Sequence, residues 1–352
     1  MADTGCLEMI RIGFIGCGQV TERLHLPALR SIKGIEVSAL ADHDSERLQR
    51  VAGLSGNPDC YSDPYSLLND SSIDVVAVCT PTQFHAEYAL KAIDRGKHVF
   101  VEKPLALKLE DCATLVEAAE SAKGFVTVGF NLRHHHLIVR AKKIIRSGRL
   151  GRIHLIRSVA CGNWQAGGPV SNWRKRVNSG GGVIFEMGVH HFDLWRFLLD
   201  SEIGEVSAQN VSGVNEDETA VVNGRMKQGA LVAASFSQST ADHNQLDIYG
   251  EHGRLCVALE RFDGLEYFSS GRQSGGLKQR LGGSLRSARE LPGALKRQFS
   301  GGSFADSYRS QWLELCESIR KGESPGSTTA DGFAAVETCI SALDSATESY
   351  QR

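Results

Sequence analysis

The first part of the chain alternates short, continuously apolar runs with longer segments in which apolar residues recur at helical spacing. The apolar runs cover residues 10–16, 35–41, 73–80, 98–103 and 125–130. A strand that is apolar throughout is covered on both faces, as in a parallel sheet with helices on either side. Residues 1–130 are therefore predicted to form a doubly wound α/β domain with a Rossmann arrangement.

The rest of the chain, residues 131–352, has a different pattern. Apolar and polar positions alternate in runs at 152–164, 205–214, 219–226, 229–239, 245–250 and 253–259. Such alternation indicates a large, open, mostly antiparallel sheet with one face in water. Helical patterns near 182–199, 304–321 and 332–349 complete an α+β domain, and its C-terminal helices (about 303–349) are expected to pack back toward the first domain.

Residues 271–302 differ in composition from both domains. Eight of the 32 are Gly, and seven Arg or Lys accompany a single Glu. This composition fits either an anion-binding arm or a solvated connection, and its glycine content favours the second. We therefore predict a flexible basic loop without a catalytic role.

The overall composition narrows the function classes. Among 352 residues, 39 are basic and 41 acidic, which argues against a nucleic-acid binder or a polybasic membrane protein. The nine cysteines include no CxxC pair, so we interpret them as reduced thiols rather than as zinc ligands or disulfides. The start of the chain lacks a signal-peptide pattern, and no apolar run is long enough to span a bilayer. We expect a cytoplasmic protein that acts on a small molecule.

A glycine-rich turn follows the first predicted strand. In "GFIGCGQV", Gly16 and Gly18 have the spacing that brings backbone amides and a helix N-terminus onto a pyrophosphate. Thr21 occupies the third glycine position of that fingerprint and is expected to widen the helix–strand packing slightly. Asp42, at the end of the next strand, is placed to accept hydrogen bonds from ribose hydroxyls, which favours NAD over NADP. The structural alternatives are a simple turn and, for Asp42, the N-cap of the following helix.

Further polar residues are predicted at the carboxyl ends of the third and fourth apolar strands. Thr80 and Pro81 end one strand, and Glu102 and Lys103 end the next. Ligands bind at this edge of open α/β sheets, and a desolvated charge there needs a partner. His85 lies one turn into the next helix, where a cofactor contact and a packing role are both open.

These motifs together resemble the Gfo/Idh/MocA family of NAD(P)-dependent oxidoreductases. The resemblance covers nearly the whole chain and rests on "GFIGCGQV…HLPAL", "ALAD", "CTPTQFH", "VEKPLA", "VGFNLR", "GGGVIFEMGVHHFDLWRFLL" and "CESIRKGESP…DG". It implies a Rossmann domain followed by an α+β domain whose sheet often forms an oligomer interface, so a homodimer or homotetramer is expected. It also implies a cis Lys103–Pro104 peptide bond.

The resemblance implies a catalytic set as well. Lys103 matches the lysine of the EKP motif, and His190 matches the histidine of an Asp-x-x-x-His motif in the second domain. The acid position is Glu186 instead of the usual Asp. Residues four apart share one face of a helix, so Glu186 and His190 can converge, whereas His191 points elsewhere and could be a packing residue.

The reaction implied is transfer of a hydride between nicotinamide and a carbinol carbon of a sugar, sugar derivative or cyclitol. His190 would move the hydroxyl proton, Lys103 would stabilise the oxygen, and Glu186 would orient the substrate. Two alternatives remain: an NAD-dependent glycoside hydrolase of the same fold, and a sensor that binds the dinucleotide without catalysis.

The remaining candidates come from loops. Trp164 and Trp173 could stack on sugar or nicotinamide, Arg174 could hold a phosphate or hydroxyl, and Asn131 and Arg133 follow the fifth strand. The adjacent histidines 134–136 are not interpreted as a metal site, because adjacent side chains diverge. The substrate candidates are Lys103, Arg133, Trp164, Glu186 and His190. The predicted cofactor contacts are Gly16, Gly18, Gln19, Val20, Asp42, Thr80, Pro81, His85, Glu102, Lys103, Asn131, Trp173 and Arg174.

Overall fold

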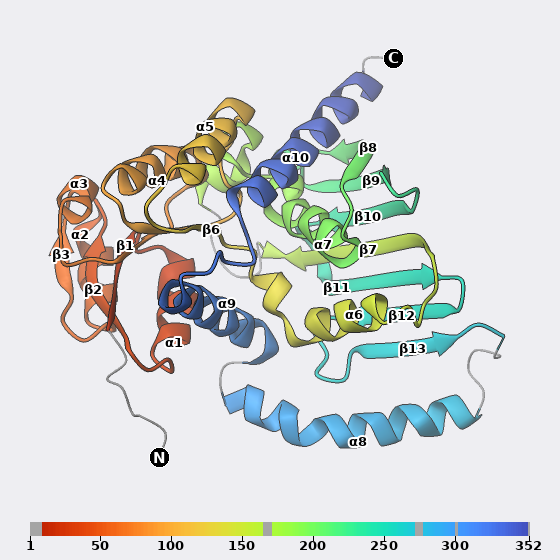
Figure 1. Ribbon diagram of the computed structural model, residues 1–352. Coiled ribbons are helices and arrows are strands. Elements are labelled where there is room, and N and C mark those ends of the chain that lie inside the picture. The colour runs from red at the N-terminus through yellow and green to blue at the C-terminus, as the bar shows by residue number, and fades with distance from the viewer. Residues whose placement is uncertain (1–8, 165–170, 272–276, 300–301, 351–352) are drawn as a thin grey trace. The chain divides into compact units, whose positions relative to one another are not determined.

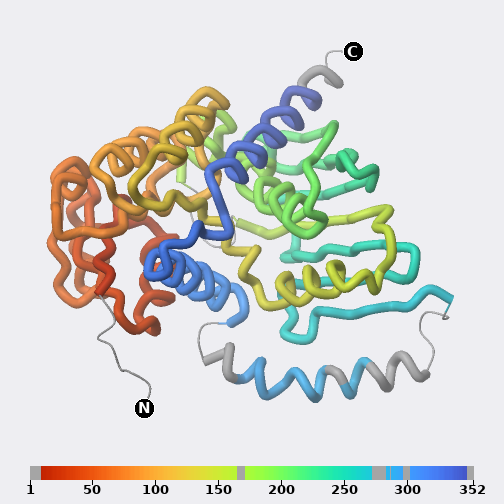
Figure 2. Tube along the Cα trace, in the orientation of Figure 1, coloured from red at the N-terminus to blue at the C-terminus, as the bar shows by residue number. Residues whose placement is uncertain are grey.

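The computed structural model describes residues 9–164, 171–271, 277–299 and 302–350, which divide into two compact units. The first unit comprises Met1–Phe130 and Tyr308–Phe333, and the second comprises Asn131–Ser307 and Ala334–Arg352. The chain thus leaves the first unit, returns to it and leaves again, as Figure 2 lets the reader follow by colour.

The first unit contains a six-stranded parallel sheet with the order β3-β2-β1-β4-β5-β6 (Figure 1). This arrangement confirms the predicted doubly wound sheet. The five predicted strands are present, and a short sixth strand, β3, was not predicted. The strands are β1 Ile10–Ile15, β2 Ile35–Ala41, β3 Asp59–Tyr61, β4 Val75–Val78, β5 His98–Val101 and β6 Val126–Val128.

Helices cover both faces of this sheet. On one face Phe14 of β1, Phe100 of β5 and Trp312 of α9 belong to one buried apolar cluster, in which Trp312 stacks on Phe100 at 4.7 Å. On the other face α4 packs against β4, β5 and α5. The helical elements are η1 Thr21–His25, α1 Leu26–Leu29, α2 Ser45–Ala52, α3 Pro64–Leu68, η2 Thr82–Phe84, α4 His85–Asp94, α5 Leu109–Glu120 and the part of α9 (Gly302–Lys321) from Tyr308 on.

The second unit contains a seven-stranded sheet with the order β13-β12-β11-β7-β10-β9-β8. Its pairs are antiparallel except for β7 with β10, so the mostly antiparallel prediction is confirmed. The strand β13 was not predicted. The strands are β7 Ile153–Asn163, β8 Ile203–Val211, β9 Thr219–Met226, β10 Leu231–Ser237, β11 Ser239–Gly250, β12 Gly253–Ala258 and β13 Leu265–Ser269.

Helices α6 and α7 pack on each other, and α7 is fixed to the sheet by a hydrogen bond from Trp195 Nε1 to Ser158 Oγ of β7 (2.9 Å). No helix in the described parts of the chain is both long enough and apolar enough to cross a bilayer. The helical elements are η3 Asn131–His134, α6 His136–Arg146, η5 Asn172–Lys175, η6 Val177–Ser179, η7 Ile184–Gly188, α7 Val189–Leu199, α8 Leu277–Phe299 and α10 Thr329–Tyr350, which continues from the first unit into the second at Ala334.

The prediction of a loop over 271–302 is wrong for residues 277–299, which form α8. Most residues of this stretch are Leu, Ala, Arg, Lys, Gln or Glu, which favour helix and outweigh its glycines. Side-chain contacts hold it, because Ser287 donates to the carboxylate of Asp263 and Arg140 pairs with Glu290 at 2.8 Å. Residues 272–276 and 300–301 lie outside the described residues.

Candidate functional site

The turn after β1 has the geometry of a phosphate-binding loop. Gly16 has φ of 100°, and a Cβ there would lie 2.6 Å from the carbonyl oxygen of Cys79, so only glycine fits. A Cβ on Gly18 would meet nothing within 4 Å, which leaves open space beside the backbone. Gln19 is exposed and Val20 half-buried at the start of the following helical turn. The loop therefore offers amides and space to a pyrophosphate.

Thr21 does not leave a gap at the third glycine position of the fingerprint. Its side chain is fully buried, and its hydroxyl donates to the carbonyl oxygen of Gly16 at 2.7 Å. From Thr21 to His25 the helix makes a π-helical turn, with more residues per turn than an α-helix. The threonine thus closes the turn with a hydrogen bond that glycine cannot make.

Asp42 lies at the carboxyl end of β2, where the sequence predicts a ribose-binding acid. Its buried carboxylate accepts hydrogen bonds from the backbone amides of Cys17 (2.8 Å) and Asp44 (2.9 Å). The N-cap of α2 is Asp44, so Asp42 is not needed for that role. The guanidinium of Arg47 lies 3.3 Å from Asp42, a neighbour that sequence analysis missed although it stands five residues downstream.

At the end of β4, Thr80 and Pro81 are half-buried, and His85 is buried. The ring nitrogens of His85 lie 2.8 Å from the carbonyl oxygen of Pro104 and 2.9 Å from that of Thr80. Burial lowers the pKa of His85, and the two carbonyl groups partly oppose this effect. Because the main chain occupies both nitrogens, we interpret His85 as a packing residue that joins two turns at this sheet edge, not as a cofactor contact.

Glu102 and Lys103 follow β5 at the same edge. The Lys103–Pro104 peptide bond is cis, as predicted. Glu102 is buried, and its two carboxylate oxygens contact His25 Nε2 (2.9 Å) and the backbone amide of Lys103 (3.1 Å). Lys103 itself is half-buried. Glu102 is therefore not part of a surface salt bridge, because its carboxylate is held inside the unit.

The second unit brings four of the predicted residues together. Arg174 Nε lies 3.3 Å from an oxygen of Glu186, which is 8% exposed. The guanidinium also lies over the rings of Trp164 and Trp173, at 5.6 and 5.2 Å from their centroids. This cluster combines two aromatic faces with a cation and a carboxylate, groups that suit a polyhydroxylated ligand. Residues 165–170 of the same loop lie outside the described residues.

The glycines at 180–182 allow this cluster to form. A Cβ on Gly181 would lie 2.2 Å from the carbonyl oxygen of Arg174, so the Arg174 segment can approach the helix start only because the residue is glycine. Asp217 caps that start by accepting the backbone N–H of Ile184 at 2.8 Å. Burial raises the pKa of Asp217 to about 6.

Glu186 and His190 lie on one continuous helical segment. Glu186 belongs to the π-helical turn Ile184–Gly188 and His190 to α7. A spacing of four residues remains close to one turn in either geometry. His190 is half-buried, whereas His191 is buried against Phe236, with ring centroids 5.5 Å apart. The assignment of His191 as the packing residue therefore agrees with its position.

Arg133 and Asn131 are buried and are joined to residues of their own unit. Arg133 forms a two-point salt bridge with Asp193 (2.8 and 2.5 Å) and is 6% exposed. Asn131 Nδ2 donates to Ser307 Oγ at 2.9 Å. Asp193 occupies the Nε–Nη2 edge of the Arg133 guanidinium, so a salt bridge holds Arg133 within the second unit. Its role as a substrate contact stays a prediction.

Among the described residues there is no group of three His, Cys, Asp or Glu that could hold a metal ion. Of the histidines 134–136, His135 accepts the backbone N–H of Leu137 and caps α6. Burial lowers the pKa of His134 to about 4, with a further contribution from Arg133. Of the three, His135 thus serves the local fold of the second unit.

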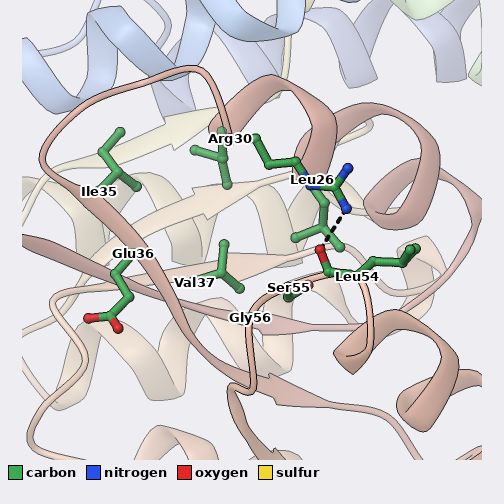
Figure 3. A pocket seen from close by; sticks show the side chains of 9 residues that line it. Leu26, Arg30, Ile35, Glu36, Val37, Leu54, Ser55 and Gly56 are labelled. Carbon is green, nitrogen blue, oxygen red and sulfur yellow. Dashed lines mark hydrogen bonds between the residues drawn. The ribbon is translucent and has the colours of Figure 1, made fainter.

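A surface pocket of the first unit lies at the amino end of β2, away from these residues (Figure 3). Across it, the guanidinium of Arg30 donates to the carbonyl oxygen of Leu54 at 2.6 Å. None of the predicted site residues lines this pocket, so we assign it no part in catalysis. Its lining is Leu26, Leu29, Arg30, Ile35, Glu36, Val37, Leu54, Ser55 and Gly56.

The class of protein follows from the fold and from comparison with known families. Residues 10–130 match the oxidoreductase family with an NAD-binding Rossmann fold, and residues 138–256 match the GFO/IDH/MocA C-terminal domain. The chain is 30% identical over 345 residues to inositol 2-dehydrogenase of Acidothermus cellulolyticus, covering 96% of this chain and 92% of the relative. The chain belongs to the GFO/IDH/MocA family, as predicted.

Two further similarities extend over almost the whole chain. Myo-inositol 2-dehydrogenase of Thermotoga maritima is 28% identical over 330 residues, 92% of each chain. The crystal structure of levoglucosan dehydrogenase with NADH and levoglucosan has a TM-score of 0.83 and 22% identity, covering 97% of this chain and 98% of the other. The prediction of an NAD-dependent dehydrogenase is confirmed.

The first unit fits NAD on its own geometry. Open space lies beside Gly18, where a side chain would intrude on a pyrophosphate. The Asp42 carboxylate accepts two backbone amides, and its longer contacts with Arg47 Nη1, at 3.3 and 3.4 Å, are the ones that ribose hydroxyls would replace. The half-buried Thr80, Pro81 and Lys103 follow neighbouring strands at the same edge. These residues would hold the dinucleotide along the carboxyl edge of the sheet.

Proposed function

We propose that the protein oxidises a secondary alcohol of a cyclitol or sugar to the ketone, or reduces the ketone, with NAD as cofactor. The observation that carries this proposal is similarity to inositol 2-dehydrogenases over more than nine-tenths of the chain. The chain also has a lysine after β5 and a histidine on α7. A binding protein without turnover would have no need for either group.

We assign the proton transfer to His190. An imidazole is a suitable base near neutral pH, and it would take the hydroxyl proton as the C–H bond of the carbinol breaks. The ammonium of Lys103 would hydrogen-bond the same oxygen and stabilise its developing negative charge. Bound NAD supplies the acceptor for the hydrogen and electron pair that leave the carbon.

The substrate's remaining hydroxyl groups would be held in the second unit. The Glu186 carboxylate can accept hydrogen bonds from vicinal hydroxyls, and Arg174 beside it limits the orientation of that carboxylate. Trp164 and Trp173 would contact the apolar face of a ring. Because Glu186 is one methylene longer than the usual Asp, we propose that it contacts a hydroxyl other than the reacting one.

The test uses the purified full chain with NAD and a panel of inositols, free sugars, anhydrosugars and glycosides. We expect net NADH formation with at least one polyol, and a decrease in kcat of roughly 10²- to 10⁴-fold in Lys103→Ala and His190→Ala. The exposed Lys108 and His154 provide matched controls, whose alanine variants should keep wild-type turnover. Cleavage of a glycoside without net NADH formation would instead support a hydrolase, and full turnover in both site variants would remove these residues from catalysis.

A further inference from the structure

A chain of buried hydrogen bonds runs through the first unit to the residue that carries the proposed catalytic ammonium. The indole Nε1 of Trp312 donates to His25 Nδ1 at 3.0 Å. His25 Nε2 lies 2.9 Å from Glu102 Oε1, and the backbone amide of Lys103 donates to Glu102 Oε2 at 3.1 Å. His25 is fully buried and Glu102 is 6% exposed. Trp312 and His25 are 287 residues apart, and sequence analysis assigns a role to neither.

The hydrogen bonds determine the tautomer of His25. An indole N–H can only donate, so Nδ1 must present its lone pair, and the ring hydrogen must be on Nε2. That hydrogen then points at the Glu102 carboxylate. A hydrogen on Nδ1 would face the indole hydrogen, so Trp312 holds His25 in one tautomer.

Aromatic rings fix the orientation of the imidazole. The centroids of Phe14, Phe100, Tyr308 and Trp312 lie 5.1 to 5.8 Å from that of His25, and three of these rings meet it edge to face. An imidazole enclosed in this way cannot rotate without displacing a neighbour. The position of the Nε2 hydrogen is therefore set by the core of the unit.

A glycine beside Glu102 leaves room for its carboxylate. A Cβ on Gly129 would lie 3.0 Å from Glu102 Oε1 and 3.2 Å from Glu102 Cα, so the glycine leaves room for this carboxylate. One oxygen accepts from the imidazole and the other from the amide of Lys103. The carboxylate thus joins the apolar core to the main chain at the point where the Lys103 side chain begins.

We propose that Trp312 and His25 are positioning residues of the catalytic site, which act through Glu102 on Lys103. The inference rests on the proposed role of Lys103 and extends it to two residues that do not touch substrate. Precise placement of a catalytic group depends on such supporting hydrogen bonds, and an error of about 1 Å can cost roughly 10²-fold in rate.

Two substitutions of His25 distinguish an effect on the position of Lys103 from a general loss of stability. In His25→Gln the amide nitrogen can replace Nε2 and still donate to Glu102. In His25→Asn the amide oxygen can replace Nδ1 and still accept from Trp312, but the donor to Glu102 is lost. Trp312→Phe keeps an aromatic ring and removes the indole donor.

Turnover per folded protein is the first readout. We expect kcat to fall at least tenfold in His25→Asn and several-fold in Trp312→Phe, with the Kd of NADH unchanged, while His25→Gln stays within about threefold of wild type. Equal kcat in His25→Asn and wild type would overturn the proposal. The proposal would also be overturned if the loss of kcat in each variant equalled the fraction of that variant that circular dichroism shows to be unfolded.

A second readout does not depend on knowing the substrate. Brief labelling of amines in the full chain, read by peptide mass spectrometry, reports the accessibility of Lys103 relative to the exposed Lys108. We expect Lys103 to label at least threefold faster in His25→Asn and Trp312→Phe, with His25→Gln and all rates at Lys108 unchanged. Unchanged labelling of Lys103 in the variants would overturn the positioning role. If instead the labelling changes but the wild-type chain oxidises none of the polyols, the proposed function is refuted and the positioning role stands.

Discussion

The predicted site residues of the first unit are held mainly by main-chain partners, whereas those of the second unit are held by other side chains. Asp42 accepts two backbone amides, and His85 contacts two backbone carbonyls. In the second unit Arg174 contacts the carboxylate of Glu186 and the rings of two tryptophans. The difference fits the division of tasks that we propose, with the cofactor held by the first unit and the substrate's hydroxyl groups by the second.

Main-chain partners persist when side chains change, so a site built on them keeps its geometry as the sequence diverges. Side-chain partners change with each substitution, so a site built on them can acquire new specificity without a new fold. The comparison therefore predicts that substitution of Asp42 in the first unit changes NAD binding, and that substitution of Arg174 in the second changes substrate binding.

The largest effect is expected for Asp42→Ala. This change removes the acceptor for ribose hydroxyls and leaves the amides of Cys17 and Asp44 without their partner. We expect the Kd of NADH, measured by fluorescence titration, to rise by up to about 100-fold, or about 2.7 kcal/mol. With Arg47 no longer paired to Asp42, the preference for NADH over NADPH should also decrease.

Glu36→Ala is the matched control for Asp42, because Glu36 is a half-exposed carboxylate at the other end of the same strand. Its Kd for NADH should equal that of wild type. An unchanged Kd in Asp42→Ala would show that the acid contributes only to the fold of the turn.

The strands that sequence analysis predicted are those with strong internal patterns. The continuous apolar runs of β1, β4 and β5 and the alternating runs of β9 and β10 could be recognised without knowledge of their neighbours. The short strands β3 and β13 are stabilised by pairing with β2 and β12, a nonlocal contact that leaves little trace in five or fewer residues.

Prediction of the site was also limited by contacts between segments that are far apart in the sequence. Glycines and charged residues at strand ends have a local signature, so Gly16, Asp42 and Lys103 could be proposed from their positions. The catalytic role of Lys103 came from the family resemblance. Arg133 forms its salt bridge with Asp193, which lies 60 residues away in the sequence. Trp312 and His25 form their hydrogen bond across 287 residues. No local pattern distinguishes such a buried arginine from one that faces a substrate.

A smaller effect, on the KM for the polyol, is expected for Arg174→Met in the second unit. Methionine keeps contact with the two tryptophan rings but removes the cation beside Glu186. We expect the KM for the polyol to rise about tenfold, or about 1.4 kcal/mol, with the Kd of NADH unchanged. Arg176→Met, at an exposed position two residues away, is the control. A rise in the Kd of NADH would place Arg174 with the cofactor instead.

The smallest effect is expected for stability in His191→Leu. His191 is buried against Phe236, and neither ring nitrogen has a hydrogen-bond partner within the described part of the chain. Leucine has a similar volume without polar atoms, so we expect the free energy of unfolding at neutral pH to increase by about 1 kcal/mol in urea titrations.

The pH dependence of unfolding tests the same residue. Burial lowers the pKa of His191 to about 4, below its ordinary value of 6.5. Between these values the unfolded chain binds a proton that the native state excludes, so His191 makes the protein less stable as the pH falls from about 6.5 to about 4. His191→Leu should reduce this loss, while His154→Leu, at a position whose side chain is 56% exposed, should leave it unchanged.

His134 has a pKa of about 4 and remains in both variants, so a residual loss of stability on acidification is expected. An equal slope in His191→Leu and wild type would mean that the second unit accommodates the imidazolium.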